Sequence, residues 1–231
     1  MFKLSSIQSL SFAVGAVGFV GLSSVLGASS AEAAIINGSF NSGFSSWQTT
    51  GVTSVTGGVA SLNTNSGSSL GALESFLGLA PGTIGTIGSS PTDGSAIKQS
   101  FFATAGDVVS FDWQFLAGDN LPYNDFAFTT LSSAAQLLSD VSIVGDFGDS
   151  GLQTFSWLIP TTGTYTLGLG VMNSLDSVVN SILEVDNVAG GSTAVPTPAL
   201  LPGLLGLGVA ALRKRKSEGS ETEKETVGVN A

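Results

Sequence analysis

The strongest constraint on the fold of this chain is a strictly alternating stretch near its centre, Val109 to Phe115 in DVVSFDWQF. Successive side chains of a β-strand point to opposite faces, so alternation of apolar and polar residues predicts a strand with one buried and one solvent-exposed face. Such a strand must cover its apolar face with a second layer. The apolar positions are Val109, Phe111, Trp113 and Phe115, and the polar ones are Ser110, Asp112 and Gln114.

Six other segments read as strands, separated by turns rich in Gly, Pro, Asn and Asp. Gly57-Gly58 predicts a tight turn inside the first segment, and Pro160 to Gly163 predicts a hairpin between the fourth and the fifth. The segments are Gly51–Leu62, Ile97–Ala103, Asp125–Leu131, Gln153–Ile159, Tyr165–Val171 and Ser181–Val188.

Helical spacing is confined to short stretches. Leu70 to Leu79 has helical spacing and ends before Pro81, while Leu131 to Leu138 is a candidate for a second helical turn or two. Gly85 to Gly94 has the composition of a loop. The fold class predicted is therefore all-β, an antiparallel β-sandwich with one or two short helices, and a jelly roll is its most economical version.

Charge excludes one large class of partner. Residues 34–195 hold 12 carboxylates and a single cation, Lys98, which gives a net charge near −11. Phosphate binding depends on Lys and Arg, so this domain does not bind nucleic acid. The chain also has no cysteine and no histidine. That excludes disulfides, Ser-His-Asp and Cys-His catalysis, and metal sites built on His or Cys.

The first residues have the pattern of a secretory signal peptide over 1–33. Lys3 precedes an apolar run from Phe12 to Leu26, and Ala31-Glu32-Ala33 is an A-x-A cleavage site that would leave Ala34 first. Export through the secretion machinery is therefore expected. The one folded domain is predicted over residues 34–190, followed by a linker at 191–195.

A second targeting pattern covers residues 196–216. Pro196, Thr197, Pro198 and Ala199 precede an apolar run to Leu212, which as a helix only marginally spans a bilayer. Four cations follow and would stay cytoplasmic, and residues 217–231 have the Glu/Ser/Thr composition of a disordered acidic tail. The cations are Arg213, Lys214, Arg215 and Lys216.

This order of features resembles the PEP-CTERM family of sorting tags, in its Pro-Thr-Pro-Ala variant. The resemblance implies recognition and removal by the membrane enzyme exosortase during export to the cell surface, typically in bacteria that make exopolysaccharide. The chain departs from the family by lacking Pro-Glu-Pro and by continuing past the basic cluster. A plain single-span anchor and a buried apolar helix are the alternatives.

Further stretches resemble two groups of proteins. NGSFNSGFSSWQTTG is similar to the first strand and loop of carbohydrate-binding-module-like jelly rolls. GSAIKQSF, DWQFLAGDNLPYNDFAF and GTYTLGLGVMNSLDSVVNSILEVDNV resemble the body of secreted PEP-CTERM proteins from cyanobacteria. The first resemblance implies a structural calcium shared by the first and last strands, at Asn37 and at Asp186 with Asn187. The alternative is that Asn37 shapes a turn and Asp186 faces solvent.

Two acidic loops are candidates for ligand contact. Asp119 and Asp125 flank Tyr123 in AGDNLPYND, where an aromatic ring beside carboxylates suits a sugar, with Trp47 as another candidate glycan contact. A turn is nevertheless the first interpretation of this loop, as it is of Asp140, Asp146 and Asp149, and the glycan contact is the second.

Catalysis would have to use a pair of carboxylates at a glycosidic bond. Glu74, Asp112 and Glu184 are eligible, but their spacing singles out no pair, so no catalytic residue is assigned. The sequence predicts an exported, non-enzymatic protein of the cell surface or extracellular matrix with a structural or binding role. The alternatives are a carbohydrate-binding module for exopolysaccharide and, third, a carboxylate-only glycosidase.

Both targeting patterns predict the mass of the mature protein. If both are processed, protein recovered from the envelope or medium of its host begins at Ala34 and ends between Val195 and Ala199. Intact-mass spectrometry of the two fractions measures this. A mass that still includes Arg213 to Ala231 would make the C-terminal segment a membrane anchor and end the sorting-tag interpretation.

Overall fold

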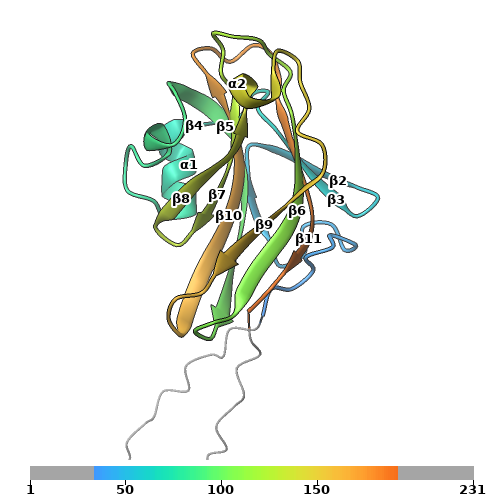
Figure 1. Cartoon of the computed structure of the whole chain (residues 1–231), viewed down its shortest axis with the longest axis vertical. Helices are drawn as coiled ribbons and strands as arrows, with labels where there is room; N and C mark the ends of the chain where they lie inside the picture. The colour runs from blue at the N-terminus through green and yellow to red at the C-terminus, as the bar shows by residue number, and fades with distance from the viewer. Residues whose placement is uncertain (1–33, 192–231) are drawn as a thin grey trace, which may run out of the picture. The chain divides into compact units, whose positions relative to one another are not determined.

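The computed structural model describes residues 34–191, and the predicted signal peptide, sorting segment and acidic tail lie outside these residues. Two antiparallel sheets pack face to face, and the chain crosses between them repeatedly (Figure 1). The antiparallel β-sandwich predicted from the alternating segments is therefore confirmed. The two ends of the described chain are adjacent, because the Ile35 N–H donates to the Gly190 carbonyl at 3.2 Å.

Sheet A has the strand order β1-β5-β10-β7-β8, and the short strand β4 also pairs with β5. Its two longest strands, β5 and β10, pair along almost their whole length. The strands are β1 (Gln48–Thr50), β4 (Ser68–Ser69), β5 (Pro91–Ala103), β7 (Phe126–Leu131), β8 (Ala134–Asp140) and β10 (Gly163–Ser174).

Sheet B has the order β2-β3-β11-β6-β9. The predicted tight turn is confirmed, since β2 and β3 form a hairpin through Gly57 and Gly58, both at positive φ. The strands are β2 (Val52–Thr56), β3 (Val59–Asn63), β6 (Val108–Leu116), β9 (Gln153–Leu158) and β11 (Ile182–Ala189).

The main core lies between the two sheets. Strand β6 shows the predicted alternation, because Val109, Phe111, Trp113 and Phe115 are buried and the residues between them are not. On β11, Leu183 and Val185 are buried while Glu184 and Asp186 lie on the other face, also as predicted. Burial of apolar surface at about 25 cal/mol per Å² makes this layer the main source of stability.

A second core cluster lies on the other side of sheet A, under helix α1 (Leu70–Leu77). It joins Leu73 and Leu77 of the helix to Phe126 and Phe128, so strand β7 is buried on both faces. Gly170 of β10 permits this packing, because a Cβ there would lie 2.4 Å from the Phe128 ring. The helix predicted at Leu70 to Leu79 is confirmed and ends at Gly78 in the left-handed region.

The prediction of a helix at Leu131 to Leu138 was wrong. Strand β8 occupies Ala134–Asp140 and pairs with β7 through a turn at Ser132, whose φ is 53°. Pairing along a buried strand outweighs the helix propensity of the Ala and Leu residues. The second helix is instead the single turn α2 (Val141–Val144).

The predicted hairpin between Gln153–Ile159 and Tyr165–Val171 was also wrong, because β9 belongs to sheet B and β10 to sheet A. The Ile159 N–H donates to the Asp107 carbonyl, and Ile159 accepts from Gly106, so the chain is tied to the β5–β6 turn before it crosses. Period two shows which side chains are buried but not which strand is the neighbour.

Two smaller predictions were corrected. Residues 91–94 were expected in a loop and instead begin β5, because Gly94 pairs with both Ser68 and Met172. The stretch 37–51, whose resemblance implied a first strand followed by a loop, forms successive turns up to residue 47 and then strand β1 at Gln48–Thr50. Between residues 34 and 191, no helix has the length and hydropathy needed to cross a membrane.

The hydrogen bonds accepted by the Glu74 carboxylate should contribute measurably to the stability of the fold. Its carboxylate is buried and accepts from the Gly82 N–H at 2.8 Å and the Ile84 N–H at 2.9 Å, which fixes the segment (Ile84–Thr86) after α1. The Glu74→Gln variant keeps one acceptor and turns an NH₂ group toward the other N–H. We expect a loss of about 2–4 kcal/mol of unfolding free energy by urea denaturation.

The same substitution at Glu184, on the outer face of sheet B, is the matched control and should change stability by less than about 0.5 kcal/mol. Equal effects of the two substitutions would contradict a structural role for Glu74.

Candidate functional site

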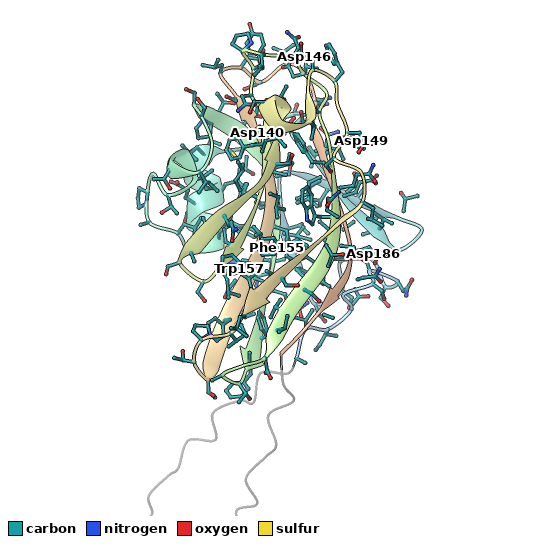
Figure 2. The ribbon with its side chains drawn as sticks, viewed as in Figure 1. Asp140, Asp146, Asp149, Phe155, Trp157 and Asp186 are labelled. Atoms are coloured by element: carbon teal, nitrogen blue, oxygen red, sulfur yellow. The ribbon has the colours of Figure 1, made fainter. Side chains whose placement is uncertain are left out.

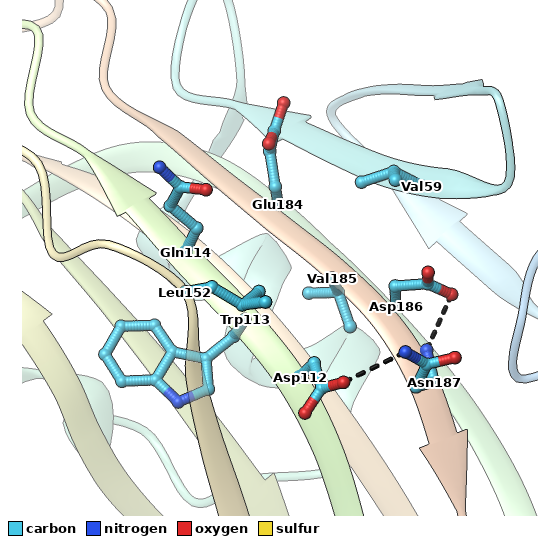
Figure 3. A pocket seen from close by; sticks show the side chains of 9 residues that line it. All are labelled: Val59, Asp112, Trp113, Gln114, Leu152, Glu184, Val185, Asp186 and Asn187. Carbon is cyan, nitrogen blue, oxygen red and sulfur yellow. Dashed lines mark hydrogen bonds between the residues drawn. The ribbon is translucent and has the colours of Figure 1, made fainter.

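A groove of about 250 Å³, lined by polar and apolar side chains, lies on the outer face of sheet B, where β6 and β11 run side by side (Figure 3). Register places Asp112 opposite Asp186 and Gln114 opposite Glu184. These residues occupy the solvent-facing positions of the two alternating strands. The strands that contribute to the core therefore also form the outer face of sheet B. The groove is lined by Val59, Asp112, Trp113, Gln114, Leu152, Glu184, Val185, Asp186 and Asn187.

Asp112 is the most constrained carboxylate of the groove. Its Oδ1 accepts from the Thr154 hydroxyl at 2.6 Å and its Oδ2 from the Asn187 amide at 2.9 Å. These two hydrogen bonds, first that of Thr154 and then that of Asn187, lower the pKa of Asp112. Asp112 is therefore ionised at neutral pH and presents fixed acceptor oxygens.

A β-bulge near the end of β11 brings Asn187 into the groove. Register with β6 shifts between Asp186 and Ala189, and Asn187 has a φ of 51°. Its backbone N–H donates to the Asp186 carboxylate at 2.6 Å while its side chain donates to Asp112 (Figure 3). Asn187 thus connects two carboxylates of like charge on neighbouring strands, which would otherwise repel each other.

Gln114 and Glu184 form the other end of the groove. The Gln114 amide nitrogen donates to both oxygens of Asp149, at 2.8 and 2.9 Å, which fixes the orientation of the side chain. Its amide oxygen lies on the side of Glu184 (Figure 3). Glu184 points away from the sheet and accepts no hydrogen bond from the residues at 34–191. These oxygens are available to a ligand.

The groove suits a ligand rich in hydrogen-bond donors. Carboxylate and amide oxygens accept from hydroxyl groups, and the three carboxylates disfavour an anionic ligand. Trp113 is the only aromatic residue of the lining, and it is just 8% exposed because its ring packs inward. The groove therefore offers hydrogen-bond acceptors beside the aliphatic side chains of Val59, Leu152 and Val185, without a large aromatic stacking surface.

Trp47 was expected to contact a glycan, and the structure places it in the core instead. Its side chain is 7% exposed, its ring lies 5.2 Å from that of Phe40, and its indole N–H donates to the Asn37 carbonyl. The indole holds the turns of residues 37–47 together, so it is not free to stack on a sugar.

The loop of Tyr123 does not present its acids beside the ring. Tyr123 is partly exposed, but Asp119 is 3% exposed and Asp125 is completely buried. Asp125 accepts from the Ser174 N–H at 2.9 Å and the Ser181 hydroxyl at 2.7 Å. The structure therefore brings Asp119 and Asp125 together below the surface, away from any glycan.

Asp140, Asp146 and Asp149 accept hydrogen bonds from nearby backbone N–H groups, in line with their interpretation as turn residues (Figure 2). Asp140 caps α2 by accepting from the Ile143 N–H at 2.9 Å. Asp146 accepts from the Leu121 N–H at 3.0 Å, and Asp149 accepts from the Gly151 N–H at 2.7 Å. The three carboxylates thus have separate structural partners.

Asn37 shapes a turn, which was the alternative to a calcium ligand. Its amide nitrogen donates to the Gly43 and Ser45 carbonyls, and its Oδ1 accepts from the Ser42 N–H at 3.2 Å. Across residues 34–191, no three acidic, His or Cys side chains converge on one point. The calcium site at Asn37 and Asp186 stays a prediction.

Of the carboxylates eligible for catalysis, the structure brings two into the groove, Asp112 and Glu184, while Glu74 is buried beside α1. Gln114, Asp186 and Asn187 lie with them, which the sequence did not indicate. The alternating pattern of each strand indicates that these polar residues face solvent. It does not indicate that β6 and β11, which are far apart in sequence, are neighbours in the sheet.

No protein-family model matches the sequence, and no curated protein matches it. Among solved structures, one described as "CBM4 structure and function", a carbohydrate-binding module, aligns with 66% of this chain and 99% of its own length. The sequence identity is 13% and the TM-score 0.36. The β-sandwich assignment rests on the sheet topology of this chain itself.

The buried carboxyl group of Asp125 should give the free energy of unfolding an unusual pH dependence. Burial, more than the nearby charges of Asp119 and Asp176, raises the pKa of Asp125 from 3.8 to about 6. The folded state then binds this proton more tightly than the unfolded chain, so the free energy of unfolding rises as pH falls from about 7 to 4. Asp125 contributes up to about 3 kcal/mol to this rise.

Urea denaturation of the wild type and of Asp125→Asn, at several pH values and in the presence of a metal chelator, measures the contribution of Asp125 to this pH dependence. The variant cannot take up the proton, so its stability should lack that part of the pH dependence. Parallel pH profiles of the two proteins would contradict the assignment.

Proposed function

We propose that this chain is an exported, non-catalytic β-sandwich protein of the cell surface or extracellular matrix that binds a neutral polysaccharide in the groove of sheet B. The observation that carries the proposal is the row of oxygens of Asp112, Gln114 and Glu184 on the outer face, of which those of Asp112 and Gln114 are fixed by hydrogen bonds. Hydrogen bonds already hold Asp112 and Gln114, so a ligand that donates to them orders little side-chain structure on binding.

Electrostatics supports a neutral ligand. The groove contains three carboxylates, Asp112, Glu184 and Asp186, and no Lys or Arg side chain. Uronic acids and sulfated sugars would bring like charge into this site, which costs affinity. Uncharged hydroxyl groups donate to the same oxygens without that penalty.

The chemistry of the acids supports binding rather than hydrolysis. A glycosidase needs one carboxyl group that stays protonated to serve as the general acid. Hydrogen bonds lower the pKa of Asp112 and oppose this role. Asp125, whose pKa is raised, is completely buried and does not line the groove.

Two sequence patterns support export. The signal-peptide pattern of residues 1–33 and the Pro-Thr-Pro-Ala segment with its basic cluster, 196–216, both lie outside the described residues. With them we propose the secretion machinery and an exosortase-type enzyme as processing partners.

A purely structural role in the matrix is the second candidate. It is favoured by the lack of an exposed aromatic ring in the groove, since most sugar-binding sites gain affinity by stacking. Such a protein would bind no soluble glycan, which separates the two candidates.

Substitutions of the polar residues in the groove should weaken polysaccharide binding. Affinity electrophoresis of the purified chain in gels containing neutral polysaccharides, the host's own exopolysaccharide and a polyuronate should show retardation by a neutral polymer. The Gln114→Ala and Glu184→Ala variants should each weaken the affinity about tenfold, the cost of one or two hydrogen bonds.

Tyr123→Ala is the matched control, because it removes a partly exposed aromatic side chain at a distance from the groove. Its retardation should equal that of the wild type. Loss of binding in Tyr123→Ala alone would move the site to its loop, and no retardation by any polymer would favour the structural role.

A further inference from the structure

A cleft of about 420 Å³ opens between the two sheets at one side of the sandwich. Strands β1 and β2 end the two sheets at one side and are joined only by Gly51, so β8 and β9 end them at the other side. The cleft lies between β8 and β9, and α2, at the end of β8, borders it (Figure 1). Its volume is within the range of about 300–1,000 Å³ that is usual for small-molecule sites.

A β-bulge in β8 turns two consecutive side chains toward this cleft. Ala127 of β7 pairs with Ser139, and the next pair is Phe128 with Leu137, so Leu138 is the extra residue of the bulge. Ala127 belongs to the core between the sheets, and paired residues of neighbouring strands share a face. Ser139 therefore faces the space between the sheets, and Leu138 packs against the same core. In a regular strand these two side chains would point to opposite faces.

The hydroxyl group of Ser139 is a buried polar group without a partner. Ser139 is 2% exposed, and its Oγ makes no hydrogen bond within residues 34–191. A buried hydroxyl group that makes no hydrogen bond costs free energy, and a ligand that bonds to it removes this cost. Because Ser139 lines the cleft, a ligand bound there can reach this hydroxyl group.

The rest of the lining combines apolar surface with hydrogen-bonding groups. Trp113 faces between the sheets and is 8% exposed, and Ile143 of α2, which is 65% exposed, lines the cleft as well. The Gln153 amide nitrogen donates to the Ser150 carbonyl at 3.0 Å, which leaves the amide oxygen as an acceptor for a ligand. Asp149 is the only charged residue of the lining.

We propose that this cleft binds one unit of a neutral sugar. A sugar ring has an apolar face of C–H groups, which packs on side chains such as Trp113, and hydroxyl groups, which pair with those of Ser139 and Gln153. The carboxylate of Asp149 disfavours a uronic acid. A small ligand with few hydrogen bonds binds weakly, with a Kd of about 1–10 mM.

The cleft is distinct from the groove of sheet B and does not rest on the function proposed for it. The groove lies on the outer face of the sheet, whereas the cleft lies on its inner side. Trp113 is the only residue that the two linings share.

NMR spectra of the backbone amides of the purified full chain, titrated with glucose, galactose, mannose and xylose, test the site. At least one sugar should shift the signals of Leu138, Ser139 and Ile143 in a saturable way, and glucuronate should bind about tenfold more weakly. Ser139→Ala should lower the affinity about fivefold, because one hydrogen bond to the sugar is lost. It should keep or raise the Tm, because without the sugar the hydroxyl group has no partner.

Ser156→Ala is the matched control, because Ser156 is an exposed serine of β9 that does not line the cleft. Its affinity should equal that of the wild type. Glu184→Ala, in the groove of sheet B, should also leave these shifts unchanged, so that failure of this proposal and failure of the groove proposal are told apart.

The absence of a saturable shift with every sugar would overturn the proposal, and a lower Tm of Ser139→Ala would then assign the hydroxyl group to a structural water molecule. Equal affinities of the wild type and Ser139→Ala would overturn it as well. Glucuronate that binds as tightly as the neutral sugars would overturn the assignment to a neutral ligand.

Discussion

The pairing of β6 with β11 in the middle of sheet B is the constraint on which both the core and the groove depend. The inward residues of these strands, among them Phe115 and Leu183, are completely buried against sheet A. Because side chains alternate, fixing the inward residues also fixes which polar residues stand together outside. A slip of one residue would bury Asp112 and Glu184 and expose the aromatic residues, so the stability of the core protects the geometry of the groove.

The scarcity of cations shapes the electrostatics of the domain. With one lysine among residues 34–191, carboxylates are satisfied by hydroxyl groups, amides and backbone N–H groups instead of ion pairs. Where such donors are plentiful, as at Glu74, the carboxylate organises the local fold. At Oδ2 of Asp119, no donor among residues 34–191 reaches the buried oxygen, so this atom has no hydrogen-bond partner there.

The two faces of the sandwich are used differently. The outer face of sheet A is covered in part by α1, and a second core cluster lies beneath this helix. The outer face of sheet B is not covered by a helix, and its polar residues are held by hydrogen bonds within the face, such as those from Thr154 and Asn187 to Asp112. A pre-organised, uncovered sheet face is a natural place for a ligand to bind.

The sequence by itself determined the fold class, the residues that face the core, the hairpin at Gly57-Gly58 and the helix at Leu70 to Leu79. These follow from local chemistry, namely the period of the apolar residues and the backbone freedom of glycine. Only the tertiary structure decided that β9 and β10 lie in different sheets, that Trp47 is a core residue and that Asp112 stands opposite Asp186. The physical reason is that strand neighbours and burial depend on contacts between segments far apart in sequence, and alternation is compatible with several such pairings.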